Sequence, residues 1–375
     1  MSAVLEEHID YLTLPERAGL YKEAIARSVV SGDIVADLGC GFGVLGIDCL
    51  KAGASRVYGI DSSDAIEVAR ETVRRAGLED RYTCIRGSSF RTDLPEKVDV
   101  LICDHIGYFG YDYGILPMLA DARSRFLKPG GKIIPSGLTL KIAAVHSRKA
   151  RELVDRWVSA PVPGECAWLQ EYAVNSKHPI NLSKQDICSD VAPLGHIDLT
   201  SDEPDHFVFE TTVSAEKNCT LDGLGGWFDC ELAPGVTMTN SPVKAGSIGR
   251  DQLFLPITKP VPIKAGQQIS ITLRIDMEGD ILTWTITPEG EKAQTMSTWK
   301  SKILTPQDLV ARLDQPLETN QVGTARAAIL RLVDGTRTGR QIEDLVVEQH
   351  HDLMPSERHL RDFIRRELGQ SADLP

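Results

Sequence analysis

Membrane-spanning segments, secretory signals and clustered cysteines are all missing from this sequence of 375 residues. Charged residues interrupt every apolar run well before the roughly 20 residues that a membrane-spanning helix needs. The N-terminus has no basic stretch ahead of an apolar one, so we expect no secretory signal. The eight cysteines include no C-x-x-C pair, which argues against a zinc site and a disulfide scaffold. We therefore expect a cytoplasmic protein with reduced thiols, no metal and no membrane association.

An excess of basic residues is also absent, because the formal net charge is -12. Duplex nucleic acid rewards clustered positive charge, so we expect no nucleic-acid partner. An acidic surface instead suits cationic or amine-bearing substrates. A hydrophobic fraction of 42% with 25% charged residues is typical of a folded chain of this length, with room for two domains and a small third one.

The first 137 residues alternate short β-branched runs with helical patterns. Alternation of this kind predicts a parallel sheet covered by helices, an α/β fold of Rossmann type. A sharp turn is expected at 128–132, where proline and glycine punctuate the chain. The expected strands are Asp33–Leu38, Arg56–Ile60, Arg81–Arg86, Val98–Cys103 and Gly131–Ile134, and the expected helices are Val44–Ala52, Asp64–Ala76 and Ile115–Phe126.

Period-two segments follow from 138 to about 300 and predict a mostly antiparallel β domain of barrel type. Within it, residues 165–194 are mixed and partly polar, which fits either a surface excursion or a dimerisation arm. Residues 301–375 return to helical periodicity and predict a small helical module. The expected strands are His206–Val213, Gly226–Leu232, Leu253–Ile257, Gln267–Ile275 and Ile281–Thr287, and the expected helices are Pro306–Leu313, Gly323–Val333, Gly339–His350 and Ser356–Leu368.

A glycine-rich loop directly follows the first expected strand and opens the first expected helix. Its Gly39, Gly41 and Gly43 let the backbone turn tightly beside a ligand, and the helix N-terminus offers free N–H groups. The spacing is G-x-G-x-G rather than the G-x-G-x-x-G of dinucleotide folds, and Asp37 precedes it. Asp61 ends the next strand, where a carboxylate can accept both ribose hydroxyls. Each residue alone could serve a turn or a helix cap, but the whole set favours S-adenosylmethionine over a nicotinamide cofactor.

From about Glu6 to Gly290 the chain resembles the protein arginine methyltransferases. The resemblance implies a class I methyltransferase sheet that binds S-adenosylmethionine, a β-barrel carrying an arm, and a head-to-tail homodimer closed by that arm. The matching stretches are Val35–Gly43, Lys51–Ser63, Leu94–Asp99, Gly107–Phe109, Arg125–Ser136, Trp227–Asp229 and Phe254–Gly266.

The resemblance also implies contacts to the cofactor from several parts of the chain. Arg17 would pair with the methionyl carboxylate, and His8 would help to close the N-terminal helix over the cofactor. The family's acidic partner for the adenine amine aligns nearest Phe90, where this chain departs from the pattern. The implied cofactor-binding residues are His8, Arg17, Asp37, Gly39, Gly41, Gly43, Asp61, Ser62, Ser88, Ser89 and Asp104.

The residues with which the family grips arginine are altered in this chain. The family uses two glutamates nine residues apart, and here those positions hold Asp104 and Tyr113, with Asp112 one residue out of register. The family's Thr-His-Trp loop reads Ser247–Gly249, and the aspartate that partners its histidine falls at Leu14. Changes at so many positions of one pocket indicate a retooled acceptor site.

An amine acceptor must lose its proton before it attacks the methyl group of a sulfonium. Asp104 lies at the carboxyl end of a central strand and is the expected proton acceptor, with Tyr113 or Asp112 assisting. A structural hydrogen bond is the alternative role for Asp104, and an aromatic wall is the alternative for Tyr113. Tyr108 is expected as a wall of the substrate pocket.

The C-terminal module contains Leu332–Ile342, which resembles the helical half of winged-helix-like domains found with ribosomally made peptides. We therefore expect an N-methyltransferase whose amine or guanidine acceptor is carried on a peptide of ribosomal-peptide (RiPP) biosynthesis or on a small metabolite. Arginine, free or in a protein, is the alternative acceptor. A non-catalytic scaffold that binds the cofactor is the second alternative.

Overall fold

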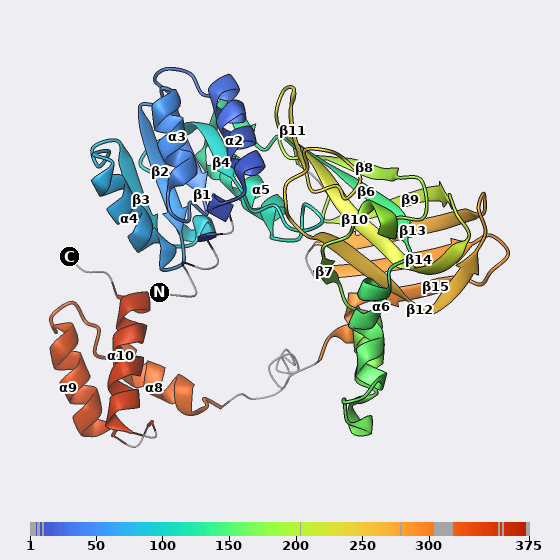
Figure 1. Ribbon diagram of the computed structural model, residues 1–375. Coiled ribbons are helices and arrows are strands. Elements are labelled where there is room, and N and C mark those ends of the chain that lie inside the picture. The colour runs from blue at the N-terminus through green and yellow to red at the C-terminus, as the bar shows by residue number, and fades with distance from the viewer. Residues whose placement is uncertain are drawn as a thin grey trace. The chain divides into compact units, whose positions relative to one another are not determined.

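The computed structural model describes residues 5, 8, 9, 11–202, 204–277, 280–303, 318–351, 353, 354 and 356–372 (Figure 1). The chain divides into two compact units, residues 1–302 and residues 303–375. The helix expected at Pro306–Leu313 lies outside the described residues. None of the helices in the described part of the chain is long and apolar enough to cross a membrane.

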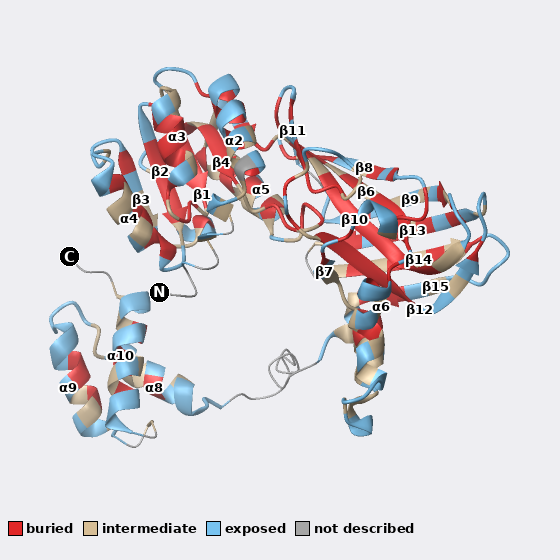
Figure 2. Cartoon of the chain, viewed as in Figure 1, coloured by how far each residue is buried: buried red, intermediate tan, exposed pale blue. Residues whose placement is uncertain are grey.

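The N-terminal part of the first unit is a five-stranded parallel sheet with helices packed against it, which confirms the expected α/β fold. Its elements are α2 (Pro15–Ser28), β1 (Ile34–Leu38), α3 (Val44–Ala52), β2 (Arg56–Asp61), α4 (Ala65–Arg75), β3 (Tyr82–Arg86), β4 (Val98–Cys103), α5 (Ile115–Phe126) and β5 (Leu127–Ile134). The strand order is β3-β2-β1-β4-β5, so the order reverses between β1 and β4. Ligands of such sheets bind beyond the carboxyl ends of the strands at this reversal. Figure 2 shows how completely β1 and β4 are buried.

The turn expected at 128–132 is instead part of a strand. β5 begins at Leu127, immediately after α5, and pairs first with Val98 and then, from Lys132, with Val100. The register shift between these pairs absorbs Pro129 and Gly130, and Gly130 has a φ of +77°. A bulge of this kind accommodates a proline without an N–H group and a left-handed glycine while the chain stays in the sheet.

The rest of the first unit consists of two antiparallel sheets, as the period-two pattern predicts. Its strands are β6 (Gly137–Val145), β7 (His178–Ile180), β8 (Ala192–Asp198), β9 (His206–Ser214), β10 (Cys219–Ala233), β11 (Val236–Thr239), β12 (Gln252–Ile263), β13 (Gln268–Asp276), β14 (Ile281–Pro288) and β15 (Gln294–Ser297). One sheet has the order β7-β12-β10-β6-β8 with β11 on β10, and the other has the order β15-β14-β13-β9. The indole of Trp284 on β14 is fully buried and donates a hydrogen bond to the carbonyl of Pro256 on β12 at 2.8 Å, which joins the two sheets.

A helical segment projects from these sheets between β6 and β7 (Figure 1). It contains α6 (Arg148–Asp155) and α7 (Leu169–Val174) and begins at Ser147, whose side chain accepts a hydrogen bond from the Ala150 amide. The excursion expected at 165–194 therefore starts earlier. Its second half returns to the sheet as β7, which pairs with β12.

The second unit contains three helices, α8 (Gln321–Leu330), α9 (Gly339–Gln349) and α10 (Glu357–Ser371), around a small apolar core. Each helix starts at a residue whose side chain accepts a backbone N–H, namely Asn320, Thr338 or Ser356. No strand occurs among the residues that are described between 318 and 372.

Candidate functional site

The glycine-rich loop between β1 and α3 adopts a backbone that only glycine accommodates easily. Gly39, Gly41 and Gly43 have φ values of +64°, +52° and +78°. A Cβ atom at Gly39 would overlap the imidazole of His105, and one at Gly41 would lie 3.0 Å from the ring of His8. Two histidine side chains therefore cover the loop, and the His8 ring also stacks on Phe42 with ring centroids 4.4 Å apart.

Asp37, which was expected to contact the cofactor, is enclosed in the protein beside this loop. It is 1% exposed, and its carboxylate accepts hydrogen bonds from the Gly46 amide at 2.9 Å and the Tyr82 hydroxyl at 3.2 Å. Burial raises the pKa of Asp37 to about 7, although these two hydrogen bonds lower it. The side chain thus holds β1 to α3 and acts on a ligand only through the loop.

Asp61 is positioned at the carboxyl end of β2 by backbone and hydroxyl donors. Its Oδ2 accepts the Gly41 amide at 2.9 Å, which ties it to the glycine loop. Its Oδ1 accepts the amide and the hydroxyl of Ser63, at 2.8 and 2.7 Å. The sequence analysis named Ser62, which is exposed beside this cluster, and missed Ser63. The carboxylate is partly exposed and keeps lone pairs that can accept the hydroxyl groups of a ribose.

Ser88 and Ser89 lie at a short 3-10 turn (Ser89–Arg91) that follows β3. The carbonyl of Ser88 accepts the Thr92 hydroxyl at 2.9 Å, and the carbonyl of Ser89 accepts a hydrogen bond from Arg125 of α5. Ser89 is 8% exposed, whereas Phe90, at the position of the family's acidic residue, is 49% exposed. The turn therefore has a fixed backbone and carries an exposed aromatic ring.

Asp104 directly follows β4 and is held by two side chains of α2. Arg17 forms an ion pair with its carboxylate, and the Tyr21 hydroxyl donates a hydrogen bond to Oδ1 at 2.8 Å. The side chains of both members of the ion pair are only 10% exposed. Burial lowers the pKa of Arg17, yet its Nε, enclosed in the protein, has no hydrogen-bond partner. An unsatisfied buried donor of this kind is costly and marks a place where an anionic or acceptor group fits.

Asp112, which was expected to assist as a proton partner, uses both carboxylate oxygens within its own loop. Its carboxylate accepts the amides of Tyr108 and Phe109, at 2.9 and 2.8 Å, and so closes its own loop. Burial raises the pKa of Asp112. Tyr113 is 37% exposed and meets Tyr108 edge to face, with ring centroids 5.6 Å apart. Burial also raises the pKa of Tyr113, so its hydroxyl is protonated near neutral pH.

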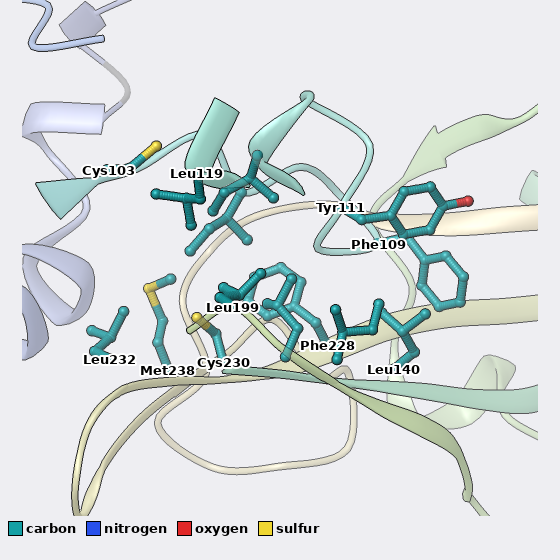
Figure 3. Packing of buried hydrophobic residues seen from close by; sticks show 14 of the residues in the cluster. Cys103, Phe109, Tyr111, Leu119, Leu140, Leu199, Phe228, Cys230, Leu232 and Met238 are labelled. Carbon is teal, nitrogen blue, oxygen red and sulfur yellow. The ribbon is translucent and has the colours of Figure 1, made fainter. Parts of the chain in front are cut away.

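The loop that carries these residues is anchored in the antiparallel part of the unit. Figure 3 shows Phe109, Tyr111, Leu140 and Phe228 in one cluster of buried residues. A Cβ atom at Gly226 of β10 would overlap the Phe109 ring, so a glycine is needed there for this contact. Asn240 adds a polar tie, because its amide donates to the Tyr108 carbonyl at 2.8 Å. This packing fixes the loop that contains residues 108–112 against the β sheets.

Two residues that the sequence analysis did not select also belong to the site. His105 lies over Gly39, and burial lowers its pKa, so that its imidazole is neutral near pH 7. Arg250 lies between β11 and β12 and donates a hydrogen bond from Nη1 to the carbonyl of Ile106. The only signal for Arg250 in the sequence is its place directly after the altered loop 247–249. In that loop Ile248 is buried, and a Cβ atom at Gly249 would lie 3.3 Å from the Leu14 side chain. The altered loop 247–249 therefore lies against Leu14, the position that holds an aspartate in the family.

Comparison with known proteins agrees with this fold. The family model for the ribosomal protein L11 methyltransferase (PrmA) matches residues 20–158. Two solved structures superpose well: the Trypanosoma brucei PRMT1 enzyme-prozyme heterotetrameric complex with AdoHcy (TM-score 0.70, 23% identity, 77% of this chain and 97% of that chain) and Arabidopsis thaliana protein arginine methyltransferase 10 (TM-score 0.68, 22% identity, 78% and 98%).

Curated relatives point to the same group. A probable protein arginine N-methyltransferase 6 of Arabidopsis thaliana is 30% identical over 245 residues, which are 62% of this chain and 56% of that protein. An arginine N(omega)-methyltransferase of Streptomyces achromogenes is 29% identical over 275 residues, or 71% and 75%. The match thus spans little more than half the length of the plant relative. The fold resembles that of the class I methyltransferases, and residues 20–158 match a methyltransferase family model. Among the proteins that it matches, the chain is similar to protein arginine N-methyltransferases at about 30% identity.

Proposed function

We propose that this chain is an S-adenosylmethionine-dependent N-methyltransferase that acts on an amine or guanidine acceptor. The observation that carries the proposal is the ion pair of Arg17 with Asp104 at the end of β4, in the same unit as the glycine loop and Asp61. The glycine loop, Asp61 and Asp104 lie at the carboxyl ends of β1, β2 and β4, and Arg17 reaches Asp104 from α2. That is where a nucleoside-containing ligand binds such a sheet.

The residues present fit the proposed cofactor. S-adenosylmethionine supplies a methyl group on a positively charged sulfur, which is transferred by in-line displacement. Arg17 has a buried Nε without a partner, which suits the methionyl carboxylate. Asp61 has remaining lone pairs for the ribose, and the three left-handed glycines leave space along the loop. Positioning and exclusion of water are the contributions that the protein then makes.

Asp104 is the residue that we assign to the acceptor. Its carboxylate would orient the acceptor nitrogen and take up the proton that this nitrogen loses. A guanidinium is best held by two carboxylates, but Asp112 points into its own loop. A single carboxylate suits an amine better than a guanidinium. We therefore favour an amine acceptor and keep arginine as the alternative.

Mass spectrometry of products tests this proposal directly. Purified protein is incubated with S-adenosylmethionine and a panel of free arginine, an arginine-rich peptide, diamines, amino acids with side-chain amines, and peptides with free amines. We expect methylation of an amine, and a loss of at least about 100-fold in kcat/KM in the Asp104→Asn variant. Methylation of arginine alone would support the alternative acceptor. Cofactor binding without any product would refute the proposal and leave the non-catalytic scaffold.

A peptide-borne acceptor, as in RiPP biosynthesis, is the finer proposal. It is supported by the separate C-terminal unit, whose α9 includes the end of the stretch Leu332–Ile342 that resembles peptide-binding domains. Val322 and Leu330 of α8 are 44% and 40% exposed and could contact a partner segment. Competition between a free amine and the same amine on a leader-bearing peptide measures the effect. A preference for the free amine would refute the peptide role.

We also propose a cytoplasmic homodimer. The projecting segment between β6 and β7 exposes Trp168 (56%) and Val158 (53%), an apolar surface that suits contact with a second copy. All eight cysteines are free, which suits a reducing compartment. Light scattering tests the dimer, because Trp168→Ser should shift it toward the monomer. A monomeric wild-type protein would refute the dimer, and an unchanged dimeric mass for this variant would refute the role of the projecting segment in it.

A further inference from the structure

Two buried guanidinium groups share a single carboxylate at the acceptor site. Arg17 and Arg250 are each 8% exposed. Asp104 neutralises Arg17, and in the described part of the chain no carboxylate lies within 4 Å of Arg250. The two cations are close enough for Arg250 to contribute to lowering the pKa of Arg17, after the larger effect of burial. The cluster therefore carries an excess positive charge inside the protein.

The contacts of Arg250 leave part of its guanidinium unused. Its Nη1 donates to the carbonyl of Ile106, two residues beyond Asp104, whereas its buried Nη2 has no hydrogen-bond partner. Its Cζ lies 5.2 Å from the centre of the Tyr11 ring, and the Cζ of Arg17 lies 5.4 Å from the same ring. A cation held by one carbonyl and one aromatic face is not neutralised.

A purely structural tie explains this arrangement poorly. One neutral donor would suffice to bind the Ile106 carbonyl, and burying a charge without a counter-charge costs several kcal/mol. Arginine is, in contrast, the side chain best suited to bind a carboxylate, because its planar fork offers parallel N–H groups. The unused Nη2 and the missing counter-charge both indicate that an anionic ligand group completes the site.

We infer that Arg250 binds a carboxylate of the methyl acceptor. This inference rests on the proposed function, in which the cofactor's own carboxylate is taken by Arg17. Arg250 and Asp104 then bind the two ends of one acceptor, the carboxylate at Arg250 and the amine at Asp104. A carboxylate that reaches Nη2 displaces the Tyr11 ring, which now lies against both guanidiniums.

The geometry also limits the length of the acceptor. Asp104 and the Ile106 carbonyl, to which Arg250 is bound, are two residues apart in a segment without helical structure. Two extended residues span roughly 7 Å. An acceptor that satisfies both groups therefore carries its amine several bonds from its carboxylate, as a diamino acid does. The same carboxylate can belong to a free amino acid or to the C-terminal residue of a peptide.

Pairs of acceptors that differ only in the carboxylate test the inference. The pairs are lysine with cadaverine, ornithine with putrescine, arginine with agmatine, and a lysine-ended peptide acid with its amide. For the wild-type protein we expect a kcat/KM at least about 10-fold higher for the carboxylate-bearing member. In Arg250→Gln this preference should fall to near unity, and in Arg250→Lys it should be retained in part. The peptide pair shows which source of the carboxylate is used.

Controls separate a specific effect from damage to the fold. Arg75→Gln removes an arginine that is 76% exposed on α4 and should leave the preference unchanged. Binding of S-adenosylhomocysteine by each Arg250 variant shows that the cofactor site is intact. The inference is wrong if the wild-type protein methylates both members of a pair with equal kcat/KM. It is also wrong if Arg250→Gln keeps the wild-type preference for the carboxylate-bearing member. In both cases the proposed methyl transfer itself is retained. If no acceptor is methylated, the proposed function fails and this inference fails with it.

Discussion

The overlap between Gly39 and His105 allows a sharp test of the cofactor loop. Gly39→Ala forces an L-residue into a backbone with φ +64° and places a methyl group inside the His105 ring. Gly77, which follows α4 in the same unit, has a φ of +67° but has no atom within 4 Å of an added Cβ. Gly77→Ala is therefore a control with the same backbone strain and no overlap.

The expected magnitudes follow from these two contributions. The left-handed backbone costs an alanine about 1–2 kcal/mol in either variant. Overlap with His105 adds about 1–3 kcal/mol at Gly39, because the ring is packed and has to move. Gly39→Ala should thus lower the free energy of unfolding by about 2–5 kcal/mol, against about 1–2 kcal/mol for Gly77→Ala.

Thermal melting and calorimetric binding of S-adenosylhomocysteine measure both effects. We expect Gly39→Ala to weaken binding at least about tenfold and Gly77→Ala to leave it unchanged. The double variant Gly39→Ala with His105→Ala should recover part of the lost stability, because the overlapping ring is gone. Equal losses in the two glycine variants, or no recovery in the double variant, would refute the packing of His105 over the loop.

Three further predictions address other parts of the chain. Asp104→Asn leaves the buried Arg17 without its ion pair and should lower the free energy of unfolding by about 3 kcal/mol. The double variant Asp104→Asn with Arg17→Met should lose less, because no buried charge is left unpaired. In this double-mutant cycle, losses that simply add would contradict the ion pair. Burial raises the pKa of Asp37 to about 7, so the folded protein keeps a proton that the unfolded chain releases above pH 4. The free energy of unfolding of the wild-type protein, compared with that of Asp37→Asn, should therefore fall by about 1.4 kcal/mol per pH unit from pH 4 to 7. If the free energies of the two proteins change in parallel over this range, the raised pKa of Asp37 is wrong. Arg326→Ala removes the ion-pair partner of Glu367, whose side chain is only 4% exposed. Calorimetry should then show the C-terminal unit melting several degrees lower and the other unit unchanged. A lower melting temperature of the other unit would contradict this prediction.

Short-range pattern was sufficient for most of the sheet and for part of the site. Strands β1 to β4 and helices α3 to α5 were predicted to within a residue, because their apolar periodicity involves residues only a few positions apart. Helix α2 was not predicted, and β5 begins four residues before its expected start. The glycine loop and Asp61 were selected in the same way, since each follows a predicted strand, whereas Asp104 was selected through the family resemblance and its place after a predicted strand. Resemblance to a known family added Arg17, which no local pattern marks.

What only the tertiary structure decided is the direction in which side chains point. Asp37 and Asp112 are carboxylates near ligand-binding loops, yet the amides that they accept hold them toward the protein interior. Arg250 reaches a carbonyl 144 residues earlier in the chain, and His105 covers a glycine of a different strand end. The sequence by itself therefore determined the fold class and the strand ends that carry the site. Which residues meet there depended on packing between distant segments, because a side chain's partners are set by topology and not by its neighbours in the chain.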